Sequence, residues 1–135
     1  MIVKNEAHTL SRALASLKGL ADEIIDVDTG SSDTTKDIAR KTTTHVYDYT
    51  WGDDFSAARN FSLSKATGDW ILVLDADEVI AQEDHHTIKN LLRQKEYVGY
   101  AFPQISYTND TTQYGYVPLS SFSKKYLSYA DHFSG

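Results

Sequence analysis

The distribution of apolar residues along the chain predicts strands and helices in alternation. Apolar side chains recur at helical spacing after residue 9, and a glycine closes that segment. The residues of this pattern are Leu10, Ala13, Leu14, Leu17 and Gly19. Strands are expected at residues 1–3, 23–27, 45–47 and 70–74, and further helices up to about Lys41, from 55 to 66 and from 83 to 94. Ser32 or Asp33 can cap the helix that ends near Lys41.

The segment Trp70–Leu74 is an unbroken apolar run of strand length that stops abruptly at Asp75. This pattern is typical of a strand buried on both faces in a parallel sheet. The alternation of strands and helices implies right-handed crossovers, and therefore an α/β fold with a mostly parallel central sheet and helices on both faces. Residues 97–107 and 114–122 are rich in aromatic side chains and are expected to be strands, which predicts a strand-rich C-terminal part.

Composition narrows the function classes. The 135 residues fit one domain, 1–135, and the 41% of hydrophobic residues is normal for a globular protein. A net charge of -6 with 13 dispersed basic residues argues against a nucleic-acid-binding protein. The chain has no cysteine, which excludes disulfides and thiolate metal sites. No apolar run approaches the roughly 18 residues of a membrane span and no leader is evident, so we expect a cytoplasmic protein or a cytoplasmic piece of one.

Polar clusters follow three of the predicted strands. They are Asn5-Glu6, Asp28-Thr29-Gly30-Ser31 and Asp75-Ala76-Asp77-Glu78. In open parallel sheets, ligands bind beyond the carboxyl ends of the strands, so these clusters are expected to share one edge. That convergence is a stronger indication of a binding site than any cluster alone.

Asp75 and Asp77 form the first candidate site. Two carboxylates at positions i and i+2 of a turn can direct oxygens toward one point, where a hard cation such as Mg2+ or Mn2+ relieves their repulsion. Such a cation can bridge to a diphosphate and stabilise the charge that grows on it as it departs. The alternative is a solvated turn in which Asp77 caps a helix.

Asp28 and Arg59 are candidate nucleotide contacts. The turn after Asp28 has a structural interpretation in which Gly30 supplies a positive φ and Ser32 a cap, and we expect that role not to use Asp28. The Asp28 carboxylate is therefore free to accept hydrogen bonds from a nucleobase. Arg59 can offer donors to a base or a phosphate, although by position alone a surface salt bridge is the simpler interpretation.

Four blocks, in order, resemble the family-2 inverting glycosyltransferases of the GT-A fold, a Rossmann-like nucleotide-sugar-binding fold. The resemblance covers roughly the first 80 residues closely. The blocks are Met1-Ile2-Val3-Lys4-Asn5-Glu6, Val27-Asp28-Thr29-Gly30-Ser31-Ser32-Asp33, Asp54-Phe55-Ser56-Ala57-Ala58-Arg59-Asn60-Phe61 and Gly68-Asp69-Trp70-Ile71-Leu72-Val73-Leu74-Asp75-Ala76-Asp77-Glu78.

The resemblance implies a role for each matching residue. Asp28 contacts the base, usually uracil, and Arg59 helps to hold the nucleotide. Asp75 lies by the ribose and the metal, Asp77 ligates Mn2+ or Mg2+, and Glu6 lies in the nucleotide pocket. The implied reaction is the inverting transfer of a sugar from a nucleotide sugar, usually a UDP-sugar, to an acceptor that the sequence does not identify.

The sequence also departs from the family pattern. It starts inside the first strand, and it stops after Phe133-Ser134-Gly135, ahead of a His-Glu element of close relatives. Relatives place arginines around a phenylalanine where this chain has Ser121-Phe122-Ser123, and many have a second acid at the position of Thr29. We therefore expect a piece of a longer protein, and no residue stands out as the catalytic base.

Other interpretations remain open. The chain can be a nucleotide-sugar-binding piece without turnover, and its Asp75-Ala76-Asp77 segment also resembles the nucleophile motif of haloacid-dehalogenase-like phosphatases. The Asp28-Thr29-Gly30-Ser31 segment resembles the aspartic-protease signature, although that fold is nearly all strand. Uncovered strand edges and exposed aromatic residues suggest self-association. Those aromatic residues are Tyr97, Tyr100, Tyr114 and Tyr116.

Overall fold

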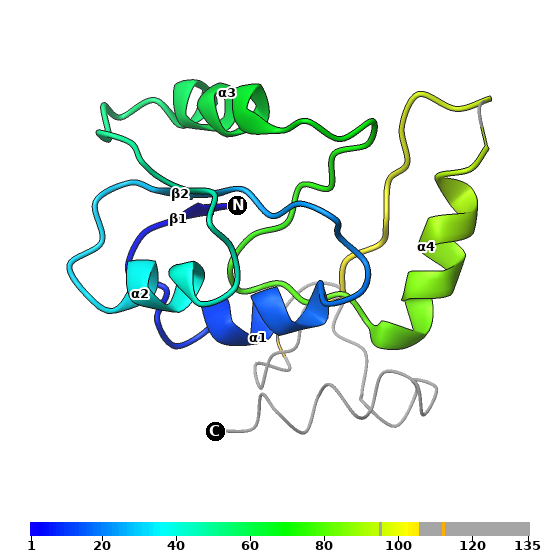
Figure 1. Ribbon diagram of the computed structural model, residues 1–135, viewed down its shortest axis with the longest axis horizontal. Coiled ribbons are helices and arrows are strands. Elements are labelled where there is room, and N and C mark those ends of the chain that lie inside the picture. Colours follow the sequence, from blue (N-terminus) through cyan, green and yellow to red (C-terminus); the bar gives the residue numbers. More distant parts are fainter. Residues whose placement is uncertain (95, 106–111, 113–135) are drawn as a thin grey trace. The chain divides into compact units, whose positions relative to one another are not determined.

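The computed structural model describes residues 1–94, 96–105 and 112 (Figure 1). Met1–Glu96 form one compact unit, and the chain from Tyr97 onward belongs to a second. The first unit contains all of the described helices and strands. The interpretation of residues 1–135 as a single domain stays a prediction.

A parallel sheet of three strands, in the order β1-β2-β3, forms the centre of the first unit. The strands are β1 (Ile2–Val3), β2 (Asp26–Asp28) and β3 (Val46–Asp48). The register pairs Val3 with Asp28 and Asp28 with Asp48, so the three strands end at the same level. The predicted parallel α/β fold is confirmed in these three strands.

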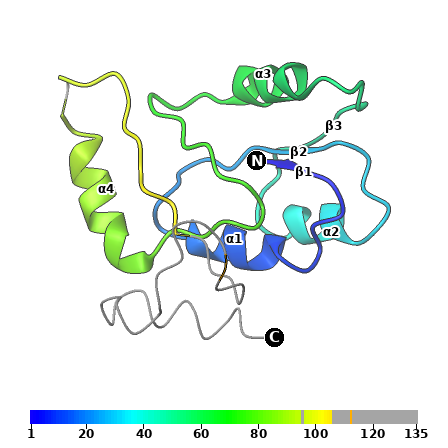
Figure 2. The same cartoon turned by 180° about the vertical axis from the view of Figure 1, so that it is seen from behind.

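Helices cover both faces of this sheet, as Figures 1 and 2 show from opposite sides. The helices are α1 (Leu10–Ser16), α2 (Thr35–Arg40), α3 (Phe55–Lys65) and α4 (His85–Leu91), the last preceded by the 3-10 turn η1 (Gln82–Asp84). α1 packs on α2 on one side of the sheet, whereas α3 contacts β1 and β2 from the other side.

The face of the sheet toward α1 and α2 holds the main apolar cluster. Its buried members are Val3, Leu10, Leu14, Ala39 and Ala76. The predicted period of α1 is confirmed, because every apolar position of that pattern is buried. Gly19 has a φ of 78°, a conformation that glycine adopts without steric cost, and it turns the chain away from the helix end.

The opposite face is covered by α3 through aromatic contacts. Tyr47 of β3 packs edge-on against Phe61, with their ring centroids 6.2 Å apart. Asp54 caps this helix, since its Oδ1 accepts a hydrogen bond of 2.9 Å from the Ala57 N–H. The helix predicted at 55–66 is confirmed at nearly the same bounds.

Two strand predictions are wrong in the structure. Trp70–Leu74 has no strand conformation, and Ile71 and Val73 are half exposed while Leu74 is buried. A strand needs a ladder partner, and the described strands β1, β2 and β3 pair only with one another. Residues 97–105 have no strand conformation either, so the strand-rich C-terminal part is not supported there. The remaining predicted strand residues, 106–107 and 114–122, lie outside the described part of the chain.

The predicted helix at 83–94 is confirmed as η1 and α4, which together cover Gln82–Leu91. Ile88 is buried, whereas Leu91 and Leu92 are only partly so. Within residues 1–94, 96–105 and 112, no helix has the length and apolar character needed to cross a membrane.

Candidate functional site

The loops that follow β1 and β2 are joined by hydrogen bonds at the carboxyl edge of the sheet. The Asn5 N–H donates to Ser31 Oγ at 2.9 Å, and the Ser32 N–H donates to Asn5 Oδ1 at 2.8 Å. Asn5 has a φ of 57°, which asparagine tolerates better than most residues. The expectation that these two clusters lie together is therefore confirmed.

Glu6 lies inside this joined loop. Its backbone N–H donates to Thr35 Oγ1 at 2.8 Å, and its carboxylate accepts a hydrogen bond of 2.7 Å from Thr9 Oγ1. Glu6 is thus held at the start of α1, next to the start of α2. Its predicted contact with a nucleotide stays a prediction.

The capping expectation for α2 is wrong in detail. Thr34 occupies the N-cap position and makes no side-chain cap bond. Asp33 instead accepts from the Thr35 N–H at 2.9 Å and from the Ala7 N–H at 3.2 Å. Hydrogen bonds from Thr35 lower the pKa of Asp33. Asp33 therefore links the two loops, while Ser32 is engaged by Asn5.

Asp28 is buried at the end of β2, and its two carboxylate oxygens differ. Oδ1 accepts from the Gly30 N–H at 2.9 Å and from the Ser31 N–H at 2.8 Å. The expectation that the turn does not use Asp28 is thus wrong, because its side chain closes the turn. Oδ2, in contrast, is buried without a hydrogen-bond partner. A buried acceptor of this kind is costly unless a donor reaches it.

Lys36 and Asp48 belong to this edge, and neither was predicted from the sequence. Lys36 Nζ lies 3.8 Å from Asp28 Oδ1 and 2.6 Å from Asp48 Oδ1. The hydrogen bond between Lys36 and Asp48 raises the pKa of the lysine and lowers the pKa of the aspartate. The signal that was available for Asp48 is its position at the end of the third predicted strand.

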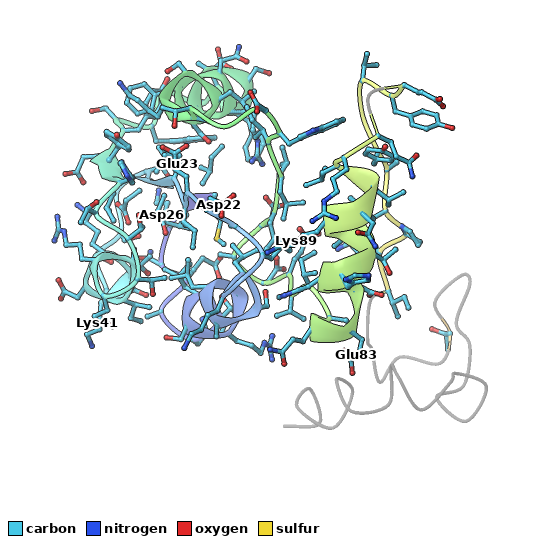
Figure 3. All side chains as sticks on the ribbon, turned by 45° about the vertical axis from the view of Figure 1, so that its right-hand side comes forward. Asp22, Glu23, Asp26, Lys41, Glu83 and Lys89 are labelled. Atoms are coloured by element: carbon cyan, nitrogen blue, oxygen red, sulfur yellow. The ribbon has the colours of Figure 1, made fainter. Side chains whose placement is uncertain are left out.

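Asp26 is a second buried acid of β2 that the sequence analysis missed. It lies within the body of the unit, whereas Lys41 projects at the outside (Figure 3). Both of its carboxylate oxygens are buried without a hydrogen-bond partner. Burial raises the pKa of Asp26 to about 6, an effect opposed by the Met1 ammonium and reinforced by Asp28. An acid inside the apolar run Ile24–Val27 was the signal in the sequence.

The third predicted cluster, Asp75-Ala76-Asp77-Glu78, forms a turn. The Glu78 N–H donates to the Asp75 carbonyl at 3.1 Å, and the Asp75 N–H donates to Glu78 Oε2 at 2.8 Å. Ala76 is buried in the same apolar cluster as Val3, which anchors the turn beside β1 and α1. Asp75 and Asp77 are both exposed on either side of this anchor.

Arg59 joins α3 to this turn. Its Nη2 donates a hydrogen bond of 3.1 Å to Asp75 Oδ1, and its guanidinium lies 5.3 Å from the centre of the Phe55 ring. The arginine side chain is 19% exposed, against 56% for Asp75. The salt bridge foreseen as the simpler interpretation is present, and it connects two residues that were predicted to bind the nucleotide.

The carboxylates of the acidic turn suit a metal ion whose other ligands come from phosphates and water. In the described residues, no group of three or more His, Cys, Asp or Glu side chains is arranged to hold a metal ion. Asp75 and Asp77 supply two exposed carboxylates, and Mg2+ in proteins is commonly held by one or two carboxylates plus substrate phosphates and water. The residues present therefore fit such an ion bound together with a diphosphate.

Comparison with known proteins identifies the family. The sequence matches the family described as "Glycosyl transferase family 2" over residues 1–133. It is 43% identical over 131 residues to a TPR repeat-containing protein of Synechococcus elongatus, covering 97% of this chain and 31% of that protein. It is 32% identical over 139 residues to an uncharacterized glycosyltransferase of Rickettsia prowazekii, covering 97% of this chain and 47% of that protein.

A further relative is the SPbeta prophage-derived glycosyltransferase SunS of Bacillus subtilis. The two are 36% identical over 100 residues, which is 72% of this chain and 24% of that protein. The chain thus spans between about a quarter and a half of the length of these three relatives. The family match extends over nearly the whole chain and includes all three polar clusters. The chain belongs to glycosyl transferase family 2.

Proposed function

We propose that this chain binds the nucleotide sugar of an inverting glycosyltransferase, with UDP as the nucleotide and Mg2+ or Mn2+ as the cofactor. The observation that carries the proposal is the unpartnered Oδ2 of Asp28 at the carboxyl edge of the sheet. Family membership supports sugar transfer, and the single free acceptor of Asp28 supports the choice of nucleotide.

The base is proposed to bind at Asp28. Its Oδ1 is occupied by the Gly30 and Ser31 N–H groups, so Oδ2 is the oxygen left to accept a hydrogen bond. Uracil presents an N–H donor between two carbonyl groups, which matches a single buried acceptor. An ionised acceptor makes this bond stronger than a neutral one would. Glu6, on the joined loop, is proposed to line the same pocket.

The diphosphate is proposed to lie at the acidic turn. Asp75 and Asp77 would hold the cation, which when bound supplies positive charge for the departing diphosphate. Arg59 would hold the nucleotide from the side of α3, because its guanidinium already reaches the Asp75 carboxylate. The donor sugar, the acceptor and the catalytic base are left unassigned.

Neither rival enzyme class is favoured by a contact in the structure. The helix α2 follows the Asp28 turn at once, unlike the nearly all-strand fold of an aspartic protease. The family match over residues 1–133 favours sugar transfer over the phosphatase interpretation. Binding without turnover remains the alternative outcome for a chain that spans part of its relatives.

The first experiment is calorimetric titration of UDP into the 135-residue chain with Mn2+, then with a chelator. Asp77→Asn tests the metal ligand, and Asp22→Asn, an exposed acid that precedes β2, is the matched control. We expect binding that needs Mn2+, that Asp77→Asn abolishes, and that Asp22→Asn leaves unchanged. Failure of the folded wild-type chain to bind UDP would refute the proposal.

Substrate assays on the same samples separate transfer from binding alone. Hydrolysis or transfer from a UDP-sugar by the chain would establish turnover. Metal-dependent UDP binding without either reaction would identify the chain as the binding part only. Competition by CDP, ADP and GDP then tests the base, since only uracil and thymine present an N–H flanked by two carbonyl groups.

A further inference from the structure

Lys36 occupies a place that the proposed nucleotide contacts do not explain. It extends from α2 to the carboxyl edge of the sheet, where its ammonium lies between Asp28 of β2 and Asp48 of β3. Its side chain is 29% exposed, while that of Asp28 is fully buried and that of Asp48 is 71% exposed. Lys36 therefore connects the buried acid to an acid at the surface.

The surroundings of Asp28 show why such a cation matters. Asp26 lies two residues earlier on the same strand, so both acids point to the same face of β2, and both are buried. The paired position on β1 is the uncharged Val3, and the paired position on β3 is the acid Asp48. Two buried carboxylates on one face repel each other, so the position of each depends on the groups that hold it.

We propose that Lys36 is a positioning residue that helps to hold the Asp28 carboxylate by its Oδ1 and directs Oδ2 toward the base of the nucleotide. This inference rests on the proposed function, because it assigns a role to a neighbour of the base-binding carboxylate. Lys36 and the Gly30 and Ser31 N–H groups all lie on the Oδ1 side. They fix the carboxylate in one orientation and leave Oδ2 as the acceptor.

Two simpler roles for Lys36 would have different effects on stability and ligand binding. As a surface ion pair with Asp48 alone, it would contribute to stability and leave base binding unchanged. As a direct phosphate contact, it would affect phosphate-containing ligands and leave a neutral nucleoside unaffected. Uridine, which carries no phosphate, is therefore the probe that separates a positioning role from both.

The test titrates uridine, by NMR, into the 135-residue wild-type chain and four variants at pH 7. Lys36→Met removes the ammonium, and Lys36→Arg keeps the charge. Arg40→Met is the matched control, since it removes a charge from the same helix whose partner is the exposed Asp37. Asp48→Asn removes the surface partner of Lys36 while Asp28 keeps its lysine.

We expect Lys36→Met to weaken uridine binding about tenfold, the equivalent of one hydrogen bond to a charged group. Lys36→Arg is expected to restore most of the affinity, and Arg40→Met to leave it unchanged. Asp48→Asn is expected to weaken uridine binding less than Lys36→Met does.

Several outcomes would overturn the inference. Equal losses in Lys36→Met and Asp48→Asn would show that only the surface pair matters. A loss for pyrophosphate but not for uridine would identify Lys36 as a phosphate contact. A loss of uridine affinity that Lys36→Arg does not restore would indicate a structural role alone. If the wild-type chain binds neither uridine nor UDP, the proposed function fails and the inference with it; if wild type binds and Lys36→Met matches it throughout, only the inference fails.

Discussion

The Nη2 atom of Arg59 lies 3.1 Å from Oδ1 of Asp75, and this ion pair ties α3 to the acidic turn. The two residues are 16 positions apart in the sequence, so the contact depends on how the chain passes from α3 to the turn. Because Asp75 is more than half exposed, water and salt screen the pair, and its effect on folding is expected to be small.

Replacement of Arg59 is expected to affect ligand binding more than folding. Arg59→Met should weaken UDP binding by about 10- to 100-fold, the range expected for loss of a hydrogen bond between charged groups. The UDP affinity of Arg59→Lys should lie between those of wild type and Arg59→Met, because lysine keeps the charge but loses the fork of donors. Calorimetry gives the affinity, and urea unfolding should show a loss below about 1 kcal/mol. A folding defect with unchanged UDP affinity would mean that the pair serves only the fold.

The sequence predicted the first half of the fold well, because its helices carry their own signals. Leu10, Leu14 and Leu17 mark the buried side of α1, and the helix predicted at 55–66 is observed as α3. The run Trp70–Leu74 has the pattern of a buried strand but lacks a partner ladder in the structure. Periodicity describes which face a segment can bury, and it does not supply the neighbour that a strand must pair with.

The candidate site was predictable only at the level of the strand ends. Parallel strands end at one edge, so Asn5 and Ser31 were expected to be near each other, and they are hydrogen-bonded. The unequal use of the two Asp28 oxygens was not predictable, because it depends on the turn geometry. The contact of Lys36 with Asp48 depends on the strand register and on the reach of a side chain from α2, neither of which the sequence pattern defines.

The reciprocal hydrogen bonds of the acidic turn predict a supporting role for Glu78. Its Oε2 accepts from the Asp75 N–H at 2.8 Å, which holds the turn that carries both proposed metal ligands. Glu78→Ala is expected to weaken Mn2+ binding in the presence of UDP by about tenfold, through loss of one hydrogen bond to a charged acceptor. Glu78→Gln keeps an oxygen acceptor and should bind nearly as wild type. Electron paramagnetic resonance of free Mn2+ measures both.

The two variants of Glu78 also separate support from ligation. If the glutamine variant loses as much Mn2+ affinity as the alanine variant, the charge of Glu78 itself is required. The residue would then be a metal ligand, and its bond to the Asp75 N–H would be secondary. Equal affinity in all three proteins would show that the turn is held well enough by its backbone and by the burial of Ala76.

Asn5 is expected to stabilise the joined loops through its backbone conformation and its side chain. Asn5→Gly keeps the positive φ but loses the acceptor for the Ser32 N–H, and should cost about 1 kcal/mol. Asn5→Ala also strains the backbone, and should cost about 1 kcal/mol more. Asn5→Asp retains the acceptor and should stay close to wild type. Urea unfolding at pH 7 gives the free energy of unfolding of each variant. An alanine variant that is more stable than the glycine variant would contradict the expected order.

The burial of Asp26 predicts an unusual dependence of the free energy of unfolding on pH. Burial raises its pKa from a usual value of 3.8 to about 6, so the folded state binds a proton more tightly than the unfolded state. Folding is therefore penalised once the acid ionises: the contribution of Asp26 to stability falls as the pH rises from about 4 to about 6, and then stays constant. A shift of about two pKa units corresponds to roughly 2–3 kcal/mol.

Asp26→Asn removes the ionisable group and is therefore expected to remove the loss of stability that its ionisation causes. The free energy of unfolding of the variant, relative to wild type, should rise by roughly 2–3 kcal/mol between pH 4 and pH 7. Comparing the two pH values cancels any constant cost of a buried amide, and Asp22→Asn, at an exposed acid, is the control. Urea unfolding at pH 4, 5, 6 and 7 measures the difference. A variant whose advantage is the same at every pH would show that Asp26 keeps its ordinary acidity in the folded chain, and that solvent or another donor reaches its carboxylate.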